Sequence, residues 1–402
     1  MKFAHIADVH IGSWRDPHMK ELSIEAFIKS IDESIKEKVD FVLIAGDLFN
    51  TAIPGIDHIK IAIKKIKELK EKGIPLYYIA GSHDYSPSGK TMLDVIEEAG
   101  LGTNVTKGDV TKDGKLKLLF TEDKKTGAKI TGLIGRRGML ERQYYENLDV
   151  KNLEKEEGFK IFMFHTSIEE LKPKELSEME ANPISFLPKG FDYYAGGHVH
   201  IVAKRDMSDQ GYKLVVYPGP TFPASFSELE KLGTGGFYIY EDGDIIRKEL
   251  NIKETISKHI KIENVSSDQA TILIEKELED ENVKGKIVLI RIEGKLSEGS
   301  SSKIDFKKIF SDLNNRGAYF IMKNSSKLSS KEFAEIKTGH SSTDEIESRT
   351  IKEHLGLTKH PFKDEENTTK DLIKTFSLEK NEGEKQSDYE ERIKKETETV
   401  LK

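Results

Sequence analysis

Residues 39–50 read VDFVLIAGDLFN, an apolar run that ends at a glycine and a carboxylate. A similar run ends at the carboxylate Asp8 in MKFAHIADVHIG, residues 1–12, and at Gly81 in PLYYIAGSHD, residues 75–84. Continuous apolar runs of this kind are typical of strands that are covered on both faces, as in parallel sheets. The carboxyl ends of such strands usually carry the binding site of an open α/β sheet. These three stretches therefore predict both the fold class and the place to look for chemistry.

Segments with helical spacing separate the three strands. Residues 22–35, 56–69 and 91–99 place apolar side chains three and four positions apart, with Ile59, Ile63 and Ile66 on one face of the second segment. The alternation predicts an α/β fold. Further strands are expected at residues 129–134, 159–164, 191–195, 214–217, 236–240 and 244–250. We expect these strands to form a second sheet packed on the first, and residues 104–126 to form a hairpin that turns at Asp113-Gly114.

The chain has 402 residues, more than one hydrophobic core usually organises. A boundary is expected near residue 252. Residues 253–325 predict a small α+β domain, with strands and helices at 257–262, 268–279, 286–292, 306–313 and 318–322. Residues 326–402 are polar and charge-dense, apart from a short apolar stripe of Leu372, Ile373, Phe376 and Leu378. This stripe fits a stray helix in a disordered tail and fits equally well an amphipathic segment that docks on a partner.

Composition limits the chemistry. The sequence contains no cysteine, which excludes disulfides and thiolate metal sites and leaves His, Asp, Glu or Asn as metal ligands. The N-terminus has no apolar run of signal-peptide length, and no stretch is long enough to cross a membrane, so we expect an intracellular protein. Proteins that bind DNA without sequence preference usually carry an excess of positive charge, so the net charge of −7 counts mildly against DNA binding. Residues 60–72 are nevertheless locally basic.

Polar side chains gather where the predicted strands end. Each of them alone has an ordinary structural explanation, because a strand-end Asp can cap a turn and a His on an apolar strand can be a core residue. Together they form a set of imidazoles and carboxylates that suits manganese, iron or zinc better than magnesium or calcium. Two such ions can clamp the attacking and leaving oxygens of a phosphoryl displacement. The members of this set are Asp8, His10, Asp47, His83, His165, His198 and His200.

The order of these residues, D-x-H, G-D, G-x-H-D, H and G-H-x-H, resembles that of the calcineurin-like metallophosphoesterase superfamily. The stretches at residues 1–12 and 39–50, and GGHVH followed by VVYPGP, closely resemble the meiotic-recombination-eleven nuclease, called SbcD in bacteria. The resemblance is strong over residues 1–250. It implies a four-layer αββα sandwich over residues 1–252, a DNA-binding capping domain at 253–325, and a linker with a helical segment at 326–402 that binds an SMC-like coiled-coil ATPase.

The resemblance also implies a role for each site residue and two manganese ions per chain. Asp8, His10 and His200 would hold the first ion, and Asp47 would bridge both. Ser82, His165 and His198 would hold the second ion. His83 would stabilise the transition state or protonate the leaving oxygen, and Asp84 would orient its ring. The implied activity is double-strand exonuclease and single-strand or hairpin endonuclease cleavage in DNA double-strand-break repair, by a homodimer formed through residues 56–69 and 91–99.

Two residues depart from the family pattern. Ser82 stands where the family usually has Asn, and its shorter hydroxyl predicts a weaker or water-mediated second ion. Asn50 stands where the family commonly has His, and it cannot donate a charge-assisted bond to a phosphate. This weakens the expectation of exonuclease cleavage more than that of metal binding. Trp14 and Arg15 are candidate DNA contacts, although a Trp in this loop is equally expected as a packed anchor.

Three functions remain open on these grounds. The first is the metal-dependent DNA nuclease. The second is a phosphatase or nucleotide phosphodiesterase that uses the same scaffold and the same two-metal chemistry. The third is a DNA-end-binding scaffold with impaired catalysis, which the changes at positions 50 and 82 suggest. The sequence has no G-x-x-x-x-G-K-[ST] phosphate loop, so any ATP hydrolysis is expected from a partner.

Overall fold

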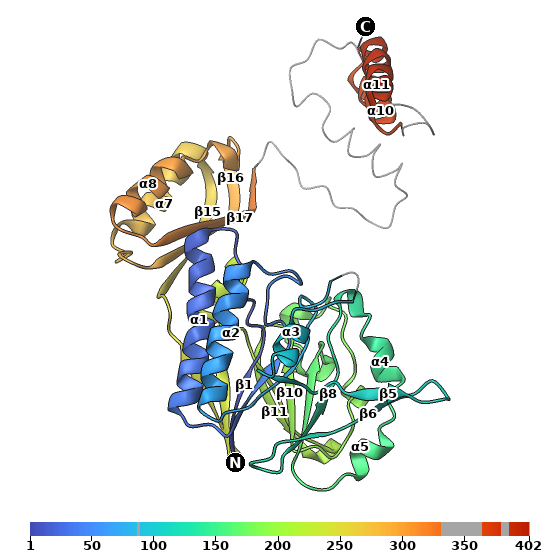
Figure 1. Ribbon diagram of the computed structural model, residues 1–402. Helices are drawn as coiled ribbons and strands as arrows, with labels where there is room; N and C mark the ends of the chain where they lie inside the picture. Colours follow the sequence, from blue (N-terminus) through green and yellow to red (C-terminus); the bar gives the residue numbers. More distant parts are fainter. Residues whose placement is uncertain (87–88, 331–363, 379–385, 402) are drawn as a thin grey trace. The chain divides into compact units, whose positions relative to one another are not determined.

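A computed structural model describes residues 1–86, 89–330, 364–378 and 386–401 (Figure 1). The chain divides into two compact units. One unit contains Met1–Ser257, Val283–Leu289 and Leu313–Met322, and the other contains the remaining segments from Lys258 onward. The chain therefore contributes two short segments from beyond residue 282 to the first unit.

The first six-stranded sheet has the order β14-β13-β1-β2-β3-β4. Its parallel strands are β1 (Lys2–Ile6), β2 (Phe41–Ala45), β3 (Leu76–Ile79) and β4 (Thr103–Asn104). All residues of β2 and β3 are buried, as the apolar runs predict. This confirms the α/β class and the three strands that precede the site residues.

The last two strands of this sheet correct one expectation. We expected residues 236–240 and 244–250 in the second sheet, and this was wrong. β13 (Gly235–Glu241) pairs antiparallel with β1, and β14 (Asp244–Leu250) pairs antiparallel with β13. The hairpin of β13 and β14 supplies hydrogen-bond partners to the edge of β1, which would otherwise be open. The order of strands along the chain does not show which strand has such an open edge.

The second sheet also has six strands, in the order β11-β12-β10-β9-β8-β7. They are β7 (Thr121–Glu122), β8 (Lys129–Gly132), β9 (Lys160–His165), β10 (Tyr193–Gly197), β11 (Val202–Met207) and β12 (Tyr212–Pro218). β11 was not predicted, because half of the residues in VAKRDM are charged and the strand lies at the sheet edge. The expected hairpin is present as β5 (Gly108–Val110) and β6 (Leu116–Leu118), between β4 and β7 in the chain.

The two sheets face each other across a shared core. Phe41 and Leu43 of β2 pack in one cluster with Ile161 of β9 and Tyr193 of β10, whereas Val42 and Ile44 pack with the helices on the other face of the first sheet. A third cluster covers the outer face of the second sheet and includes Tyr145 of α4 (Arg142–Glu146) and Leu153 of α5 (Lys151–Lys155). Successive side chains of β2 thus point alternately to the second sheet and to the helices. Packing of the two inner faces holds the strand ends of one sheet next to those of the other.

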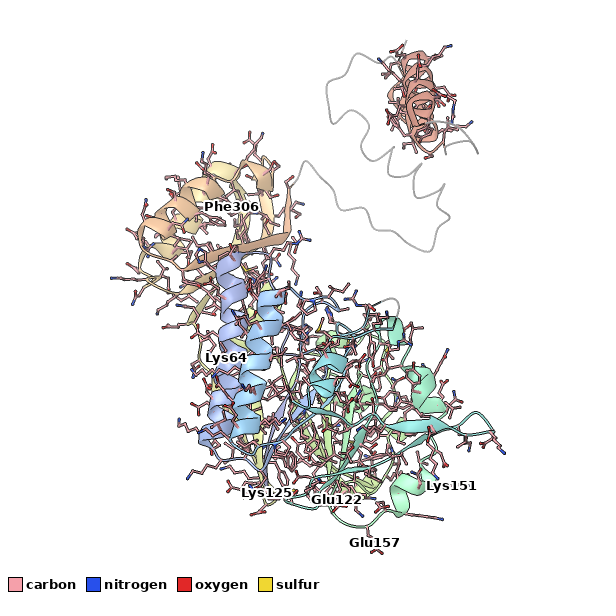
Figure 2. All side chains as sticks on the ribbon, in the orientation of Figure 1. Lys64, Glu122, Lys125, Lys151, Glu157 and Phe306 are labelled. Atoms are coloured by element: carbon pink, nitrogen blue, oxygen red, sulfur yellow. The ribbon has the colours of Figure 1, made fainter. Side chains whose placement is uncertain are left out.

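Helices α1 (Pro17–Lys36), α2 (Ile56–Glu71) and α3 (Leu93–Glu98) follow the first three strands. α1 begins five residues before the expected start, since Asp16 caps it and accepts hydrogen bonds from two backbone N–H groups. On α2 the buried residues are Ala62, Ile66 and Leu69, so Ile59 and Ile63 lie at the margin of the buried face. Charged side chains cover the outside of this unit (Figure 2). Among those labelled are Lys64 of α2, Glu122, Lys125, Lys151 and Glu157.

The later part of the chain forms a three-stranded sheet of β15 (Thr255–Ser266), β16 (Ile287–Glu298) and β17 (Phe320–Ser330). α7 (Ser267–Glu279) and α8 (Phe306–Asn315) accompany it, and a capping box of Ser266 and Gln269 starts α7. β17 runs to Ser330, so residues 326–330 are strand rather than the expected linker, because this strand is long enough to match β16. Residues 331–363 and 379–385, in the expected linker and tail, lie outside the described residues.

Two helices are described in the tail, α10 (Glu365–Phe376) and α11 (Gln386–Val400). The Tyr389 hydroxyl donates a hydrogen bond of 2.9 Å to the Leu378 carbonyl, which ties the two helices together. Leu372 and Ile373 of the apolar stripe are half-buried, whereas Phe376 is 62% exposed. Among the described residues, no helix is long and apolar enough to span a membrane.

Candidate metal centre

The predicted site residues meet where strands of both sheets end. Asp8 and His10 follow β1, Asp47 follows β2, and His83 follows β3 in the first sheet. His165 ends β9, and His198 and His200 follow the neighbouring β10 in the second sheet. Side chains up to 190 residues apart in sequence are therefore in direct contact.

The backbone at this centre is strained. Asp8, His10, Asp47 and His200 have φ between 48° and 53°, and His198 has φ of 102°. Non-glycine residues rarely adopt these conformations, which cost about 1–3 kcal/mol each and cluster at functional sites. Gly46 has φ of 87°, and a Cβ there would lie 2.1 Å from the Nδ1 of His165. The turn after β2 therefore requires glycine for both conformation and space.

Three overlapping groups of side chains bring their ligand atoms within 4.8 Å of one another: Asp8, His10 and His200; His10, Asp47 and His83; and Asp8, Asp47 and His165. The Nε2 atoms of His10 and His200 are 2.9 Å apart. Nε2 of His165 lies 3.1 Å from Oδ2 of Asp47, and its ring centroid lies 5.1 Å from that of His198. The two carboxylates are shared between groups, which is the arrangement that two neighbouring cations require.

Hydrogen bonds on the far side of each ring fix which nitrogen faces the centre. Nδ1 of His165 lies 2.8 Å from the Ala45 carbonyl, and Nδ1 of His200 lies 3.0 Å from Oε2 of Glu228. An acceptor at Nδ1 places the proton there and leaves Nε2 free to bind a metal. Both rings therefore turn Nε2 toward the centre.

The charges of the centre are strongly coupled. Burial lowers the pKa of His10 and of His198 to about 3. Burial also opposes a charge on His165 and His200, but the carboxylates of Asp47 and Asp8 outweigh it and raise these pKa values to about 10 and about 9. Protonated imidazoles thus balance the buried carboxylates. A metal cation would replace these protons, so its binding should release them.

The loop after β3 corrects one assigned role. We expected Asp84 to orient the ring of His83, but the structure contradicts this. The Asp84 carboxylate accepts hydrogen bonds from the backbone N–H groups of Leu48, Phe49 and Gly81. The Nδ1 of His83 instead lies 2.8 Å from the Asn50 carbonyl. The carboxylate is occupied by these backbone N–H groups and holds the two loops together, while the carbonyl of residue 50 orients the His83 ring.

Ser82 and the candidate DNA contacts complete the set of predicted site residues. The Ser82 hydroxyl is 3.4 Å from Oδ2 of Asp47, so it faces the carboxylate expected to bridge the ions. Trp14 donates its indole N–H to the Pro223 carbonyl and packs against the core, which is the arrangement of a loop anchor. Arg15 is exposed. Among these candidate DNA contacts, the structure brings only Asn50 into contact with a predicted site residue.

Glu228 is the residue that the sequence reasoning missed. It lies in α6 (Phe226–Leu232), accepts from the Ala224 N–H at 2.9 Å, and contacts the Ser225 hydroxyl and His200. Ser225-x-x-Glu228 has the spacing of a helix capping box, a signal visible in the sequence. What the sequence cannot show is that the same carboxylate also reaches a histidine 28 residues earlier.

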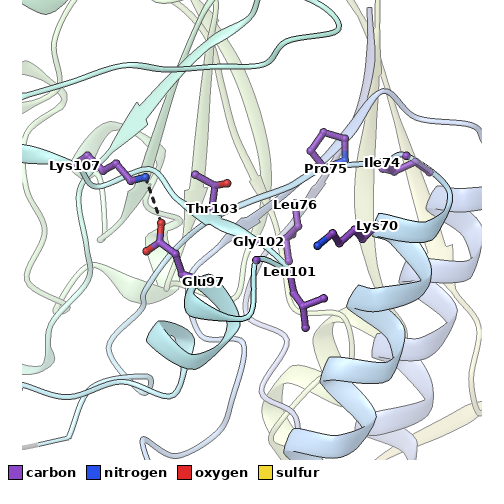
Figure 3. A pocket seen from close by; sticks show the side chains of 11 residues that line it. Lys70, Ile74, Pro75, Leu76, Glu97, Leu101, Gly102, Thr103 and Lys107 are labelled. Carbon is purple, nitrogen blue, oxygen red and sulfur yellow. Dashed lines mark ion pairs between the residues drawn. The ribbon is translucent and has the colours of Figure 1, made fainter.

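A cavity of about 500 Å³ lies elsewhere in the first unit (Figure 3). Residues 73–76 line it directly before β3, so it lies at the amino end of that strand and away from the metal centre. Lys107 and Glu97 form an ion pair of 3.3 Å at its margin, and Lys70 lies opposite. It contains none of the predicted site residues.

Comparison with known proteins agrees with this geometry. Residues 1–202 match the calcineurin-like phosphoesterase family. A relative from Methanococcus maripaludis, the DNA double-strand break repair protein Mre11, is 30% identical over 302 residues, which are 72% of this chain and 73% of the relative. The proteins of the same name from Sulfurisphaera tokodaii and Archaeoglobus fulgidus are 28% and 26% identical, over 79% and 71% of this chain and 78% and 63% of their own. The chain therefore belongs to the calcineurin-like phosphoesterase family, in its Mre11-type branch.

Proposed function

We propose that this protein is a manganese-dependent DNA nuclease that acts in double-strand-break repair. The observation that carries the proposal is the cluster of buried imidazoles and carboxylates at the ends of two facing sheets, with its ring nitrogens turned inward. The names of its relatives support DNA as the substrate. The proposed cleavage is exonucleolytic on double strands and endonucleolytic on single strands and hairpins.

The donor set fits two divalent ions, because it offers several nitrogens and two shared carboxylates in a small buried volume. Asp8, His10 and His200 would hold one ion. His165, His198 and Ser82 would hold the other, with Asp47 between them. Bound ions supply positive charge at the phosphate and make a nearby water easier to deprotonate.

His83 acts on the substrate in this proposal. Its backbone N–H donates a hydrogen bond of 2.7 Å to Asp47, and its Nδ1 faces the Asn50 carbonyl. The loop after β2 therefore holds His83 at its backbone and at its ring, with Nε2 available to a substrate. We assign to Nε2 the donation of a proton, or of a hydrogen bond, to the leaving oxygen. Its ligand atom also lies within the group of His10 and Asp47, so metal retention in a His83 variant has to be measured.

The remaining parts of the chain are proposed to serve the same reaction. Residues 253–325 would bind DNA as a capping domain, and residues 326–402 would carry the segment that binds an SMC-like coiled-coil ATPase. A homodimer is proposed through α2 and α3. Ile53 and Ile56, which are 81% and 82% exposed, and Val95, which is 49% exposed, support an apolar contact there.

The test compares wild type with His83→Ala on duplex, hairpin and single-stranded DNA in manganese, with metal content measured alongside. We expect wild type to cleave and His83→Ala to lose cleavage by about 10²-fold or more while both ions remain bound. Equal metal content in the two proteins is the control, because it separates the assigned role of His83 from a loss of ions. Cleavage by His83→Ala at the wild-type rate would contradict the assigned role.

The net charge of −7 favours a second candidate, a nucleotide phosphodiesterase whose substrate needs no basic groove. Both candidates use the same ions, so turnover of a small phosphodiester and of duplex DNA must be compared. Efficient turnover of the small substrate with no cleavage of any DNA would favour the second candidate. Fewer than two bound ions per chain with retained DNA-end binding would indicate a scaffold instead.

A further inference from the structure

A second cavity in the first unit lies near the metal centre. It has a volume of about 460 Å³, within the range of small-molecule sites. Its wall combines two half-buried tyrosines, Tyr85 and Tyr144, with an apolar floor that includes the buried Leu118 and Leu133. Side chains that can form hydrogen bonds, Thr106, Gln143 and Asn147, also line it. Flat aromatic surface together with amide edges is the composition that suits a nucleobase.

The backbone ties this cavity to the metal centre on two sides. Tyr85 directly follows His83 and Asp84. Leu133 and Ile134 directly precede Gly135, whose N–H donates to the Ala80 carbonyl at 2.9 Å. A Cβ on Gly135 would lie 2.3 Å from Cδ2 of His165, so this loop packs against the ring of a proposed metal ligand. A chain of nucleotides that reaches the centre therefore passes close to the cavity.

Arg136 follows Gly135 and contacts both tyrosines. Its Nη1 donates to the Tyr144 hydroxyl at 2.9 Å, and its guanidinium carbon lies 6.0 Å from the centre of the Tyr85 ring. Within the described ranges of the chain, it forms no ion pair with a carboxylate. Arg142, by contrast, pairs with Glu146 at 3.0 Å. A half-buried cation beside a metal centre and without an acidic partner is positioned for a phosphate.

We infer that Arg136, Tyr85 and Tyr144 form a nucleotide subsite, in which Arg136 binds a phosphate next to the scissile one and the cavity receives the attached base. The inference rests on the proposed nuclease function and names a contact for its substrate. A base can enter the cavity only when it is unpaired, so this subsite selects single-stranded or locally opened DNA.

The experiment measures DNA binding in the full-length His83→Ala protein with manganese, so that bound DNA stays intact. The probe is a single-stranded oligonucleotide with 2-aminopurine at successive positions, whose emission falls when the base stacks on an aromatic ring. Anisotropy at several salt concentrations gives the dissociation constant and its salt dependence. The added changes are Arg136→Ala, Tyr144→Ala and Tyr144→Phe, with Arg142→Ala as a control that removes the same charge from an ion pair.

We expect emission to fall at one or two positions, and Tyr144→Ala to abolish that fall. Tyr144→Phe keeps the ring, so it should retain the fall and show that the alanine effect is not unfolding. Arg136→Ala should weaken binding by on the order of 10-fold and reduce the salt slope by about one, while Arg142→Ala changes neither.

The inference is overturned if Arg136→Ala binds with unchanged affinity and salt slope and Tyr144→Ala retains the fall in emission while wild type cleaves DNA. The opposite failure is distinguishable. If wild type cleaves no DNA but the position-specific emission and the Arg136 effect are present, the nuclease proposal fails and the nucleotide subsite stands.

Discussion

Replacing Glu228 by alanine should weaken manganese binding at the ion that His200 is proposed to hold, without removing any proposed ligand. The carboxylate accepts from Nδ1 of His200 at 3.0 Å and from the Ala224 N–H at 2.9 Å. Without it, the His200 ring loses the group that fixes its proton on Nδ1 and can rotate or change tautomer.

The size of the effect follows from these contacts. A hydrogen bond to a charged group contributes about 1.5–3 kcal/mol. The Glu228 and His200 side chains are 24% and 19% exposed, so water replaces part of the lost contact and the lower half of that range applies. Loss of such an outer partner typically weakens metal binding by about 10–100-fold. We therefore expect roughly a 15-fold loss, which corresponds to about 1.6 kcal/mol.

Titration calorimetry with manganese on the metal-free protein measures this change for each ion separately. Ser225→Ala is the matched control, because Ser225 caps α6 and also contacts Glu228 but does not contact His200. It should lower the free energy of unfolding by about 1 kcal/mol and leave metal affinity near wild type. The reasoning is refuted if Glu228→Ala binds both ions with wild-type affinity, or if Ser225→Ala weakens binding as much as Glu228→Ala does.

Three further changes test other parts of the structure. Gly46→Ala should lower the melting temperature and weaken ion binding, because the added Cβ would displace His165. The control is Gly73→Ala, where φ is 71° and an added Cβ meets nothing within 4 Å. It should lower the free energy of unfolding by roughly 1–2 kcal/mol, the cost of a left-handed alanine, and leave ion binding unchanged. Ser82→Asn should tighten the second ion in calorimetry, since an amide oxygen reaches further than a hydroxyl; an unchanged affinity would remove Ser82 from the ligand set. Lys2 and Lys248 lower the pKa of Glu37 to about 2, below its value in the unfolded chain. These two ion pairs therefore stabilise the fold fully above about pH 4.5, and this contribution is lost as the pH falls toward 2. Urea unfolding of Glu37→Gln should therefore show a smaller loss of stability over that pH range than wild type.

The sequence predicted the strands of the first half well because a buried parallel strand leaves a continuous apolar run. Phe41–Ala45 is one such strand, and its end correctly locates Asp47. Edge strands lack this signal, so β11 was missed. Strand detection also says nothing about partners, which is why β13 and β14 were assigned to the wrong sheet.

The predicted site residues come together because strand ends share one edge of each sheet, a rule that needs only local information. The contacts among them do not follow from that rule. Asp84 is adjacent to His83 in the sequence, yet its carboxylate points to the backbone of the β2 loop. Glu228 belongs to none of the quoted motifs and lies 28 residues after His200, yet its carboxylate reaches that ring. Roles assigned to neighbours in the sequence therefore need the three-dimensional arrangement before they can be trusted.

The position of β13 beside β1 has a consequence for how the protein is made. β1 is the third strand across its sheet, yet its partner on one side begins only at Gly235. A growing chain that has not reached this residue exposes an unpaired central edge, which favours association with other chains. The histidines after β10 emerge only shortly before. The first sheet, which positions Asp8 and Asp47, is complete only when β13 has been made. We therefore expect ion uptake after this point, so that a loaded centre would mark a chain whose two sheets have already closed on each other.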